Sequence, residues 1–487
     1  MKYLMLLFLC GLWLTGNCQH CACADNFQSM VAKVEQNYVG YGDKVTPSNK
    51  VAFTHFTDSL RQVAARAEWQ DCFFVLRAWL RFFKDLHMSL SIDKSNDYSH
   101  DSIRTIFSRV ERSPINKMQG FLEYLEKNRE KLDSVEGLWE DESQSTTLGV
   151  MRDPRKRDEF TGIVLKADSV LWMPGQIKLR IKKNGGKYEL MYFFNNRDHD
   201  RSEYATLALN KRMLNLGIGG IWNKMQMNGQ VWEEMTPHFI PTFRVLDNNT
   251  CVLAIPSFRL QAKPIIDSLV ETNMDVIKKS RNFIIDLRNN LGGSVLSFEA
   301  LLPIIYTGPV ITKGASVLAT EANIREYYSI TDYPNISDSM KAVFRNELKE
   351  LKAHQGGMYN LWRDDTLVMK EVMPSPARVS VIVNENCASS AELFLLKARQ
   401  SSKVKIYGSH SMGAVDYADV TTTSMDCDFY KLRYPTSRTN RLPEEPIDNI
   451  GIQPNIKIPG NIVDWVEFVR TAAVTDYNNN QKRSLSK

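Results

Sequence analysis

Apolar positions along the first third of the chain recur every three or four residues, the spacing of a helix with one buried face. The pattern is clearest over 27–38, 73–83 and 118–125. Each stripe must be buried against another element, so the spacing predicts a helical region over residues 25–135. Pro47 marks a loop between its helices.

The period changes to two after Gly137. Apolar positions 177, 179 and 181 alternate with basic positions 178, 180 and 182, and Asn184-Gly185-Gly186 follows as a turn. This alternation predicts antiparallel strands. Residues 136–245 are therefore expected to form a β-rich module, a barrel or a sandwich, with Trp139, Trp172 and Trp222 in its core rather than in a ligand cage.

Short apolar runs alternate with helical stretches from residue 246 onward. The runs 251–255, 283–287 and 379–383 suit buried strands, and Val295 to Leu302 suits a helix that stops at Pro303. Buried strands that alternate with helices favour an α/β layer architecture over residues 246–470. The polar segment 471–487 is expected to be a flexible tail.

The N-terminus carries a targeting pattern. Lys2 precedes an apolar run over 4–14, shorter than the roughly 20 residues that span a bilayer, and Ala22-Cys23-Ala24 supplies small residues. Residues 1–24 are predicted to be a cleaved signal peptide, with no later membrane span. The protein is then exported to the periplasm or cell envelope, or secreted; a lipid anchor on Cys18 is the alternative.

Cleavage after Ala24 removes four of the 8 cysteines. The four that remain are too dispersed for a disulfide scaffold, and none lies in a C-x-x-C pair of the kind that binds metal. They are Cys72, Cys251, Cys387 and Cys427. Their pairing cannot be deduced from the sequence.

Composition excludes several classes of protein. The 487 residues carry a net charge of +5, with 43% hydrophobic and 24% charged residues, which is ordinary for globular domains. A charge this small is no nucleic-acid footprint. The histidines are too scattered for a metal site, so neither a metal nor another cofactor is expected.

Two fragments could carry chemistry. The β-branched strand 379–383 leads into Ser389 and Ser390 at the start of a helix, where a hydroxyl lies beside backbone N–H groups that can stabilise an oxyanion. Taken alone, this serine is more simply a helix N-cap. After the strand ending at Leu287, Gly292 and Gly293 let backbone N–H groups approach a ligand, or form a plain turn.

Together these fragments resemble the C-terminal processing peptidases, serine peptidases that include the tail-specific proteases and the tricorn core. The matching pieces lie in family order over most of residues 246–460. They are Asp286-Leu287-Arg288-Asn289-Asn290 with its glycines, Asn384-Glu385-Asn386 leading to Ala388-Ser389-Ser390-Ala391-Glu392, Gly408 to Gly413, and Gly451-Ile452-Gln453-Pro454-Asn455. The resemblance implies a crotonase-like α/β core.

The resemblance implies that Ser389 is the nucleophile and that Ser390 and Gly292 or Gly293 supply the oxyanion N–H groups. The tail-specific branch activates its serine with a lysine, but the matching position here is Ala414. The tricorn-like branch uses a histidine, and His87, where a helix ends, fits that role.

An acidic residue orients this histidine in the tricorn-like branch, and the matching residue is Asp448, with Glu444 and Glu445 as fallbacks. Asp416 and Asp419 are expected to brace a loop or subsite, and His410 is the rival base.

The sequence thus predicts an exported serine endopeptidase that cleaves peptides or unfolded proteins through Ser389, His87 and Asp448. One alternative is an inactive, peptide-binding pseudoenzyme of the same fold. A less favoured one is a Ser-Lys peptidase that uses Lys397, Lys403 or Lys405. No PDZ pattern is found, so selection of free C-termini is not expected.

Overall fold

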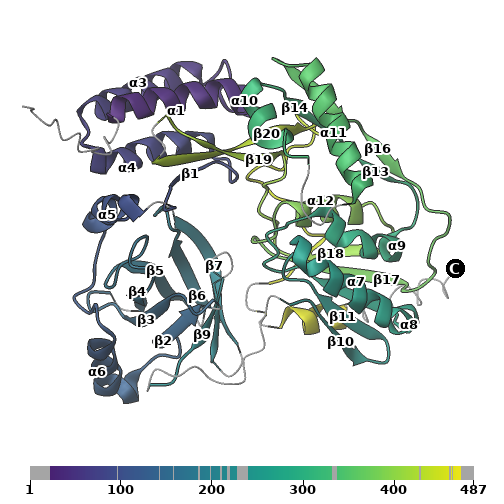
Figure 1. Cartoon of the computed structure of the whole chain (residues 1–487). Coiled ribbons are helices and arrows are strands. Elements are labelled where there is room, and N and C mark those ends of the chain that lie inside the picture. Colours follow the sequence, from purple (N-terminus) through teal and green to yellow (C-terminus); the bar gives the residue numbers. More distant parts are fainter. Residues whose placement is uncertain are drawn as a thin grey trace, which may run out of the picture.

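The computed structural model describes residues 22–472 apart from 96, 142, 157, 185–186, 198, 209–210, 217–219, 228–239, 332–336, 427–428, 460–461 and 463. A helical region, a β-barrel and an α/β core follow one another along the chain (Figure 1). None of the helices described is long and apolar enough to cross a membrane.

The helical region packs on a sheet built mostly from the far end of the chain, except for its last helix, which packs on the barrel. Its helices are α1 (Cys23–Asn37), α2 (Tyr41–Lys44), α3 (Lys50–Arg66), α4 (Trp69–Leu80), α5 (Asp97–Ile106) and α6 (Met118–Asn128). Strand β1 (Ser89–Ile92) pairs with β20 (Tyr430–Thr439), which also pairs with β19 (Tyr417–Ser424) and β14 (Ala315–Leu318). Strand β15 (Met358–Trp362) pairs with β14 at the edge of this sheet. One apolar cluster joins α1, α4 and β20.

The structure corrects the expectation that Cys23 is removed with the signal peptide. Cys23 begins α1, is buried, and forms a disulfide with Cys72 of α4, with the two Cα atoms 5.3 Å apart. The predicted cleavage after Ala24 would cut inside this helix and remove Cys23, so that boundary does not coincide with the start of the fold. Cys251 and Cys387 are buried free thiols, while Cys18 and Cys427 lie outside the described residues.

The middle of the chain forms a closed barrel of antiparallel strands (Figure 1). The strands are β2 (Gly137–Asp141), β3 (Thr147–Arg152), β4 (Glu159–Lys166), β5 (Ile177–Asn184), β6 (Lys187–Phe193), β7 (His199–Ala208), β8 (Met213–Asn215) and β9 (Ile221–Lys224). Trp139, Trp172 and Trp222 are buried in one apolar cluster, as predicted.

The α/β core is a six-stranded sheet of order β10-β11-β12-β17-β18-β21, parallel except for β10. Its strands are β10 (Thr242–Asp247), β11 (Thr250–Ala254), β12 (Asn282–Asp286), β17 (Arg378–Val383), β18 (Val404–Gly408) and β21 (Ile456–Lys457). Strand β10 crosses the predicted boundary at 245, because its backbone pairs with β11 and not with the barrel.

This sheet is covered by α7 (Lys263–Thr272), α8 (Met274–Lys279), α9 (Leu302–Ile305) and α12 (Ser390–Ala398). The helices α10 (Glu321–Asn323) and α11 (Asp338–Ala353) pack beside β14 and β15 instead. Strand β13 (Val310–Thr312) pairs with β16 (Asp365–Leu367). The helix expected over 295–302 is a 3-10 helix over Val295–Leu301, which ends just before Pro303. Pro303 lies in the first turn of the next helix, α9, where its missing N–H costs nothing.

Candidate active site

Strands β12 and β17 bring the two candidate fragments together. They are parallel neighbours, with Asp286 opposite Ile382, so the loops that follow them leave the same edge of the sheet. Asn289 links the loops: its N–H donates to Asn384 Oδ1 at 2.9 Å, and its Oδ1 accepts from Asn384 Nδ2 at 2.8 Å and Asn386 Nδ2 at 2.9 Å. The glycine loop and the serine turn are thereby fixed side by side.

Ser389 lies at the turn from β17 into α12 in a backbone conformation rare for a side-chain-bearing residue. Its φ is 56° and its ψ is −122°. Such conformations cost about 1–3 kcal/mol and persist where the surroundings hold them. A serine exposed on a strained strand-to-helix turn is the arrangement that presents a nucleophile in many hydrolases.

The glycine loop packs directly on this serine. A Cβ atom placed on Gly292, whose φ is 91°, would lie 2.8 Å from both the Cβ of Ser389 and the N of Ser390. The Gly292 N–H donates to Asn290 Oδ1 at 2.9 Å and is therefore occupied. Among the residues described, neither Gly293 N nor Ser390 N has a protein acceptor, and these two N–H groups are the ones available for an oxyanion.

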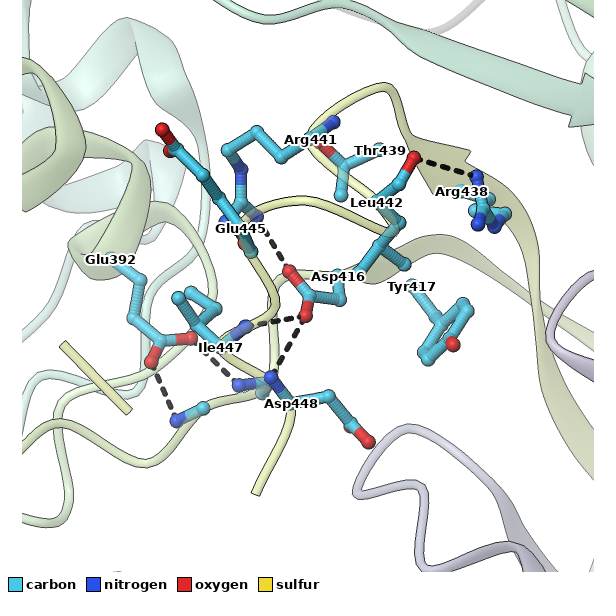
Figure 2. A network of polar contacts seen from close by, with 12 residues as sticks. Glu392, Asp416, Tyr417, Arg438, Thr439, Arg441, Leu442, Glu445, Ile447 and Asp448 are labelled. Carbon is cyan, nitrogen blue, oxygen red and sulfur yellow. Dashed lines mark hydrogen bonds and ion pairs between the residues drawn. The ribbon is translucent and has the colours of Figure 1, made fainter. Parts of the chain in front are cut away.

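Glu392 fastens the serine turn to the loop over 411–414 (Figure 2). Its fully buried carboxylate accepts hydrogen bonds from Ser389 N (3.2 Å), Ser411 Oγ (2.6 Å), Gly413 N (2.6 Å) and Ala414 N (2.8 Å). Burial raises the pKa of this carboxyl group above its ordinary value. The position that carries lysine in the tail-specific branch thus supplies only a backbone N–H here.

His87 is oriented by two oxygen atoms. Asp85, which also accepts from Tyr38 OH at 2.7 Å, accepts from the His87 backbone N at 2.8 Å. The His87 Nδ1 lies 2.8 Å from the carbonyl oxygen of Tyr417. Because a carbonyl oxygen only accepts, Nδ1 carries the proton, and Nε2 is left as the basic nitrogen.

Both candidate residues attach to one short stretch of chain. Ser389 is held by Glu392, which binds Ala414, and His87 is bound to Tyr417, three residues further on. Three residues span at most about 10 Å. The structure therefore brings Ser389 and His87, 302 positions apart in the sequence, to two ends of the same loop.

Asp448 has other partners than His87 (Figure 2). Its carboxylate forms an ion pair with Lys44 of α2 and accepts from Asn449 Nδ2 at 2.9 Å, and its backbone N–H donates to Asp416 Oδ2 at 2.8 Å. The sequence predicted that an acidic residue orients the His87 ring. In the structure the Tyr417 carbonyl oxygen binds the ring at Nδ1 instead.

The remaining acidic candidates also have partners of their own. Asp416 is fully buried, pairs with Arg441 Nη2 at 2.7 Å and accepts from Ile447 N at 2.7 Å, so it braces the loop as expected (Figure 2). Asp419 accepts from Tyr327 OH at 3.1 Å and from Ser437 Oγ. Glu445 is exposed and pairs with Arg399; Glu444 is also exposed.

The rival bases contact other groups. His410 is exposed, and its Nδ1 lies 2.7 Å from the Ser411 carbonyl oxygen. Lys397 donates to Thr312 Oγ1 on β13, and Lys403 donates to the Met373 carbonyl oxygen at 3.0 Å. Neither of these hydrogen bonds involves Ser389 or a residue that contacts it. The described residues contain no group of three or more His, Cys, Asp or Glu that could hold a metal ion.

Sequence reasoning missed Asp85, Lys44 and Tyr417. Asp85 had a local signal, since an aspartate often accepts from the backbone N–H two residues on. The backbone carbonyl of Tyr417 and the pairing of Lys44 with Asp448 had none, because both depend on contacts across more than 300 positions.

Comparisons with known proteins agree with this arrangement of motifs. Residues 249–458 match the model of peptidase family S41. Over these residues, which make up less than half of the chain, it is similar to that family, the C-terminal processing peptidases, and has a serine-peptidase-like fold. No curated protein matches the chain in sequence.

Solved structures overlap with most of the chain at low identity. Mature CPAF complexed with lactacystin is 12% identical, with 95% of this chain and 98% of that chain covered and a TM-score of 0.49. The photosystem II D1 C-terminal processing protease is 12% identical (91% and 95% covered, TM-score 0.39). The tricorn protease is 10% identical (90% and 34% covered, TM-score 0.37).

Proposed function

We propose that this protein is an exported serine endopeptidase that hydrolyses peptide bonds through an acyl-enzyme. The observation that carries the proposal is Ser389, held at positive φ against Gly292 at the N-terminus of α12. Two further features support it: the N–H groups of Gly293 and Ser390 have no protein acceptor among the described residues, and the Tyr417 carbonyl oxygen lies 2.8 Å from His87 Nδ1, which leaves Nε2 as the nitrogen that can act as a base.

In this mechanism the Oγ of Ser389 attacks the peptide carbonyl carbon while Nε2 of His87 takes the hydroxyl proton. Gly293 N–H and Ser390 N–H stabilise the oxyanion, with Gly292 shaping the loop. His87 then gives the proton to the leaving amine. A water molecule, deprotonated by His87, releases the acyl group and restores Ser389.

The third role in a Ser-His-Asp scheme falls to Asp448. Its carboxylate is bound to Lys44 through Oδ2, and direct contact with Nδ1 of the imidazole requires the Tyr417 carbonyl to give up its place there. In the observed arrangement the Tyr417 carbonyl fixes the tautomer of His87, which is the orienting half of the role that an acid performs in such triads.

A second candidate function, peptide binding without hydrolysis, is favoured by Ala414 at the lysine position and by the Lys44–Asp448 pair. The deciding experiment incubates the purified protein with an unfolded protein substrate and with a fluorophosphonate probe. We expect cleavage and labelling, and loss of both in Ser389→Ala.

His87→Ala tests the base, with the exposed His354→Ala as its matched control and His410→Ala as the rival. We expect at least a hundredfold loss of kcat in His87→Ala alone. Full activity in His87→Ala would contradict the assignment of the base. A wild-type protein that binds peptides but cleaves none would establish the second candidate.

A further inference from the structure

Large apolar side chains that remain exposed to water gather around the candidate site. Four of them lie within three residues of the groups placed there: Leu86 (51% exposed), Leu291 (44%), Val295 (47%) and Ile450 (52%). The fifth, Leu260 (45%), lies on a loop that pairs with the glycines. They come from separate loops of the chain, and we call them the apolar rim.

Three members of the apolar rim adjoin the glycine loop that packs on Ser389. Leu291 directly precedes Gly292, and Val295 follows the glycine pair. Leu260 reaches the same place because its loop is paired with the glycines: Phe258 N donates to the Gly292 carbonyl at 3.1 Å, and Ser294 N donates to the Phe258 carbonyl at 2.7 Å.

The other two members lie on the histidine side. Leu86 is next to His87, and Ile450 follows Asn449. Asn449 joins them, since its Nδ2 donates to the Lys84 carbonyl at 2.7 Å. Its backbone N donates to the Gly413 carbonyl at 3.0 Å, and Gly413 is bound by Glu392, which also holds Ser389.

Isolated exposed apolar residues are ordinary on a protein surface, but a group around one reactive serine indicates a binding surface. A subunit that covered both sides permanently would also cover Ser389. A substrate peptide covers them only during turnover, and an extended peptide places side chains on both sides of its reacting carbonyl.

We propose that the apolar rim binds large apolar side chains on both sides of the scissile bond, so that the substrates are peptide segments rich in Leu, Ile, Val, Phe or Met. This inference rests on the proposed peptidase function for its use, but the apolar binding surface itself does not require turnover.

The test compares two peptides of equal length and charge, one with leucine and one with serine at the positions that flank the cleaved bond. We expect kcat/KM to favour the leucine peptide by at least tenfold, because burial of apolar groups of this size discriminates by about that factor. Leu260→Ser and Ile450→Ser probe one side each, and each should reduce this preference about tenfold.

Val343→Ser is the matched control, since Val343 is 48% exposed on α11 and belongs to no part of the site. It should leave the preference unchanged. Equal kcat/KM for the two peptides, or equal losses for both peptides in the rim variants, would overturn the proposal.

Binding to Ser389→Ala separates this inference from the proposed function. If the wild type cleaves neither peptide, the peptidase proposal fails, and the affinity of the two uncleaved peptides for Ser389→Ala then decides the role of the apolar rim. Tighter binding of the leucine peptide, weakened in Ile450→Ser, supports it; equal affinities contradict it.

Discussion

The strained backbone of Ser389 is held in place by its neighbours. A positive φ at a serine persists only when neighbouring contacts hold it, and here the holding group is Glu392, a carboxylate that accepts from four donors. The same carboxylate fixes the loop that reaches Tyr417 and so His87. One buried side chain therefore sets the position of Ser389 and part of the position of His87, the proposed nucleophile and base.

The pairing of Asp448 with Lys44 can be tested at the level of single residues. If Asp448 acts on His87, Asp448→Asn should lower kcat about a thousandfold or more, as loss of a triad acid does. Lys44→Met should then leave kcat unchanged or raise it, because the carboxylate is released. If Asp448 only anchors α2, both substitutions should lower kcat to a similar, small extent. The pH–rate profile distinguishes the two cases, because a structural loss lowers the rate without changing its dependence on pH.

Lys178 of β5 gives a pH-dependent prediction for stability. It is 5% exposed, and its Nζ lies 4.1 Å from the centre of the Trp172 ring. Burial, then the charge of Arg197, lowers the pKa of Lys178 to about 7, while Asp141 and Asp168 act in the opposite direction. Below about pH 7 the amine is charged in both states, and its burial disfavours folding.

Between about pH 7 and 10.5 the unfolded chain keeps the proton that the folded protein has lost, so the free energy of unfolding rises with pH. Lys178→Met should therefore be more stable than the wild type at pH 6, by on the order of 3 kcal/mol. This gain should shrink as the pH rises from about 7 to 10.5. Thermal unfolding across pH measures it, with the exposed Lys182→Met as control. A gain that is constant with pH would contradict a buried, titrating amine.

At the scale of elements, the site depends on two loops that leave neighbouring parallel strands. Gly292→Ala tests their close contact. A Cβ at this position would lie 2.7 Å from the Ala388 carbonyl oxygen, and the φ of 91° is strained for alanine. We expect at least a hundredfold loss of kcat/KM in a peptide-cleavage assay.

Gly357→Ala is the matched control, because its Cβ would meet nothing within 4 Å. It should retain activity. Wild-type activity in Gly292→Ala would show that the glycine loop does not need to approach Ser389.

The elements were predictable to different degrees. Periodicity indicated α1, α4 and α6, and the alternation at 177–182 indicated the strands of the middle region. Closure of these strands into a barrel depends on the pairing of β2 with β9, which no local pattern reveals. The assignment of β10 to the α/β sheet also required a long-range pairing.

The candidate site residues could also be predicted to different degrees. Ser389, Gly292 and Gly293 stand in local motifs and could be named from them. The environment of His87 could not, because its partner is a backbone carbonyl that has no sequence signal. The role of Asp448 came from its place before a motif, and motif position does not report that Lys44, about 400 positions away, competes for its carboxylate.

At the scale of the whole molecule, the Cys23–Cys72 disulfide ties α1 to α4, the helix that leads toward His87. Cys72→Ser should lower the free energy of unfolding by about 2–4 kcal/mol, the usual effect of closing a loop of this length. Denaturant unfolding in oxidising buffer measures this. Adding Cys23→Ser to Cys72→Ser should have little further effect, whereas an additional loss of similar size would contradict the pairing.

The pairing of β1 with β20 has a consequence for biosynthesis. Ser89 finds its partner Arg433 only after about 340 further residues have been made, which takes on the order of half a minute at usual rates of synthesis. Throughout that time the segment that carries His87 has no strand to join, and the carbonyl that orients its ring does not yet exist. A nascent chain therefore cannot present an assembled candidate site, which forms only when synthesis is nearly complete.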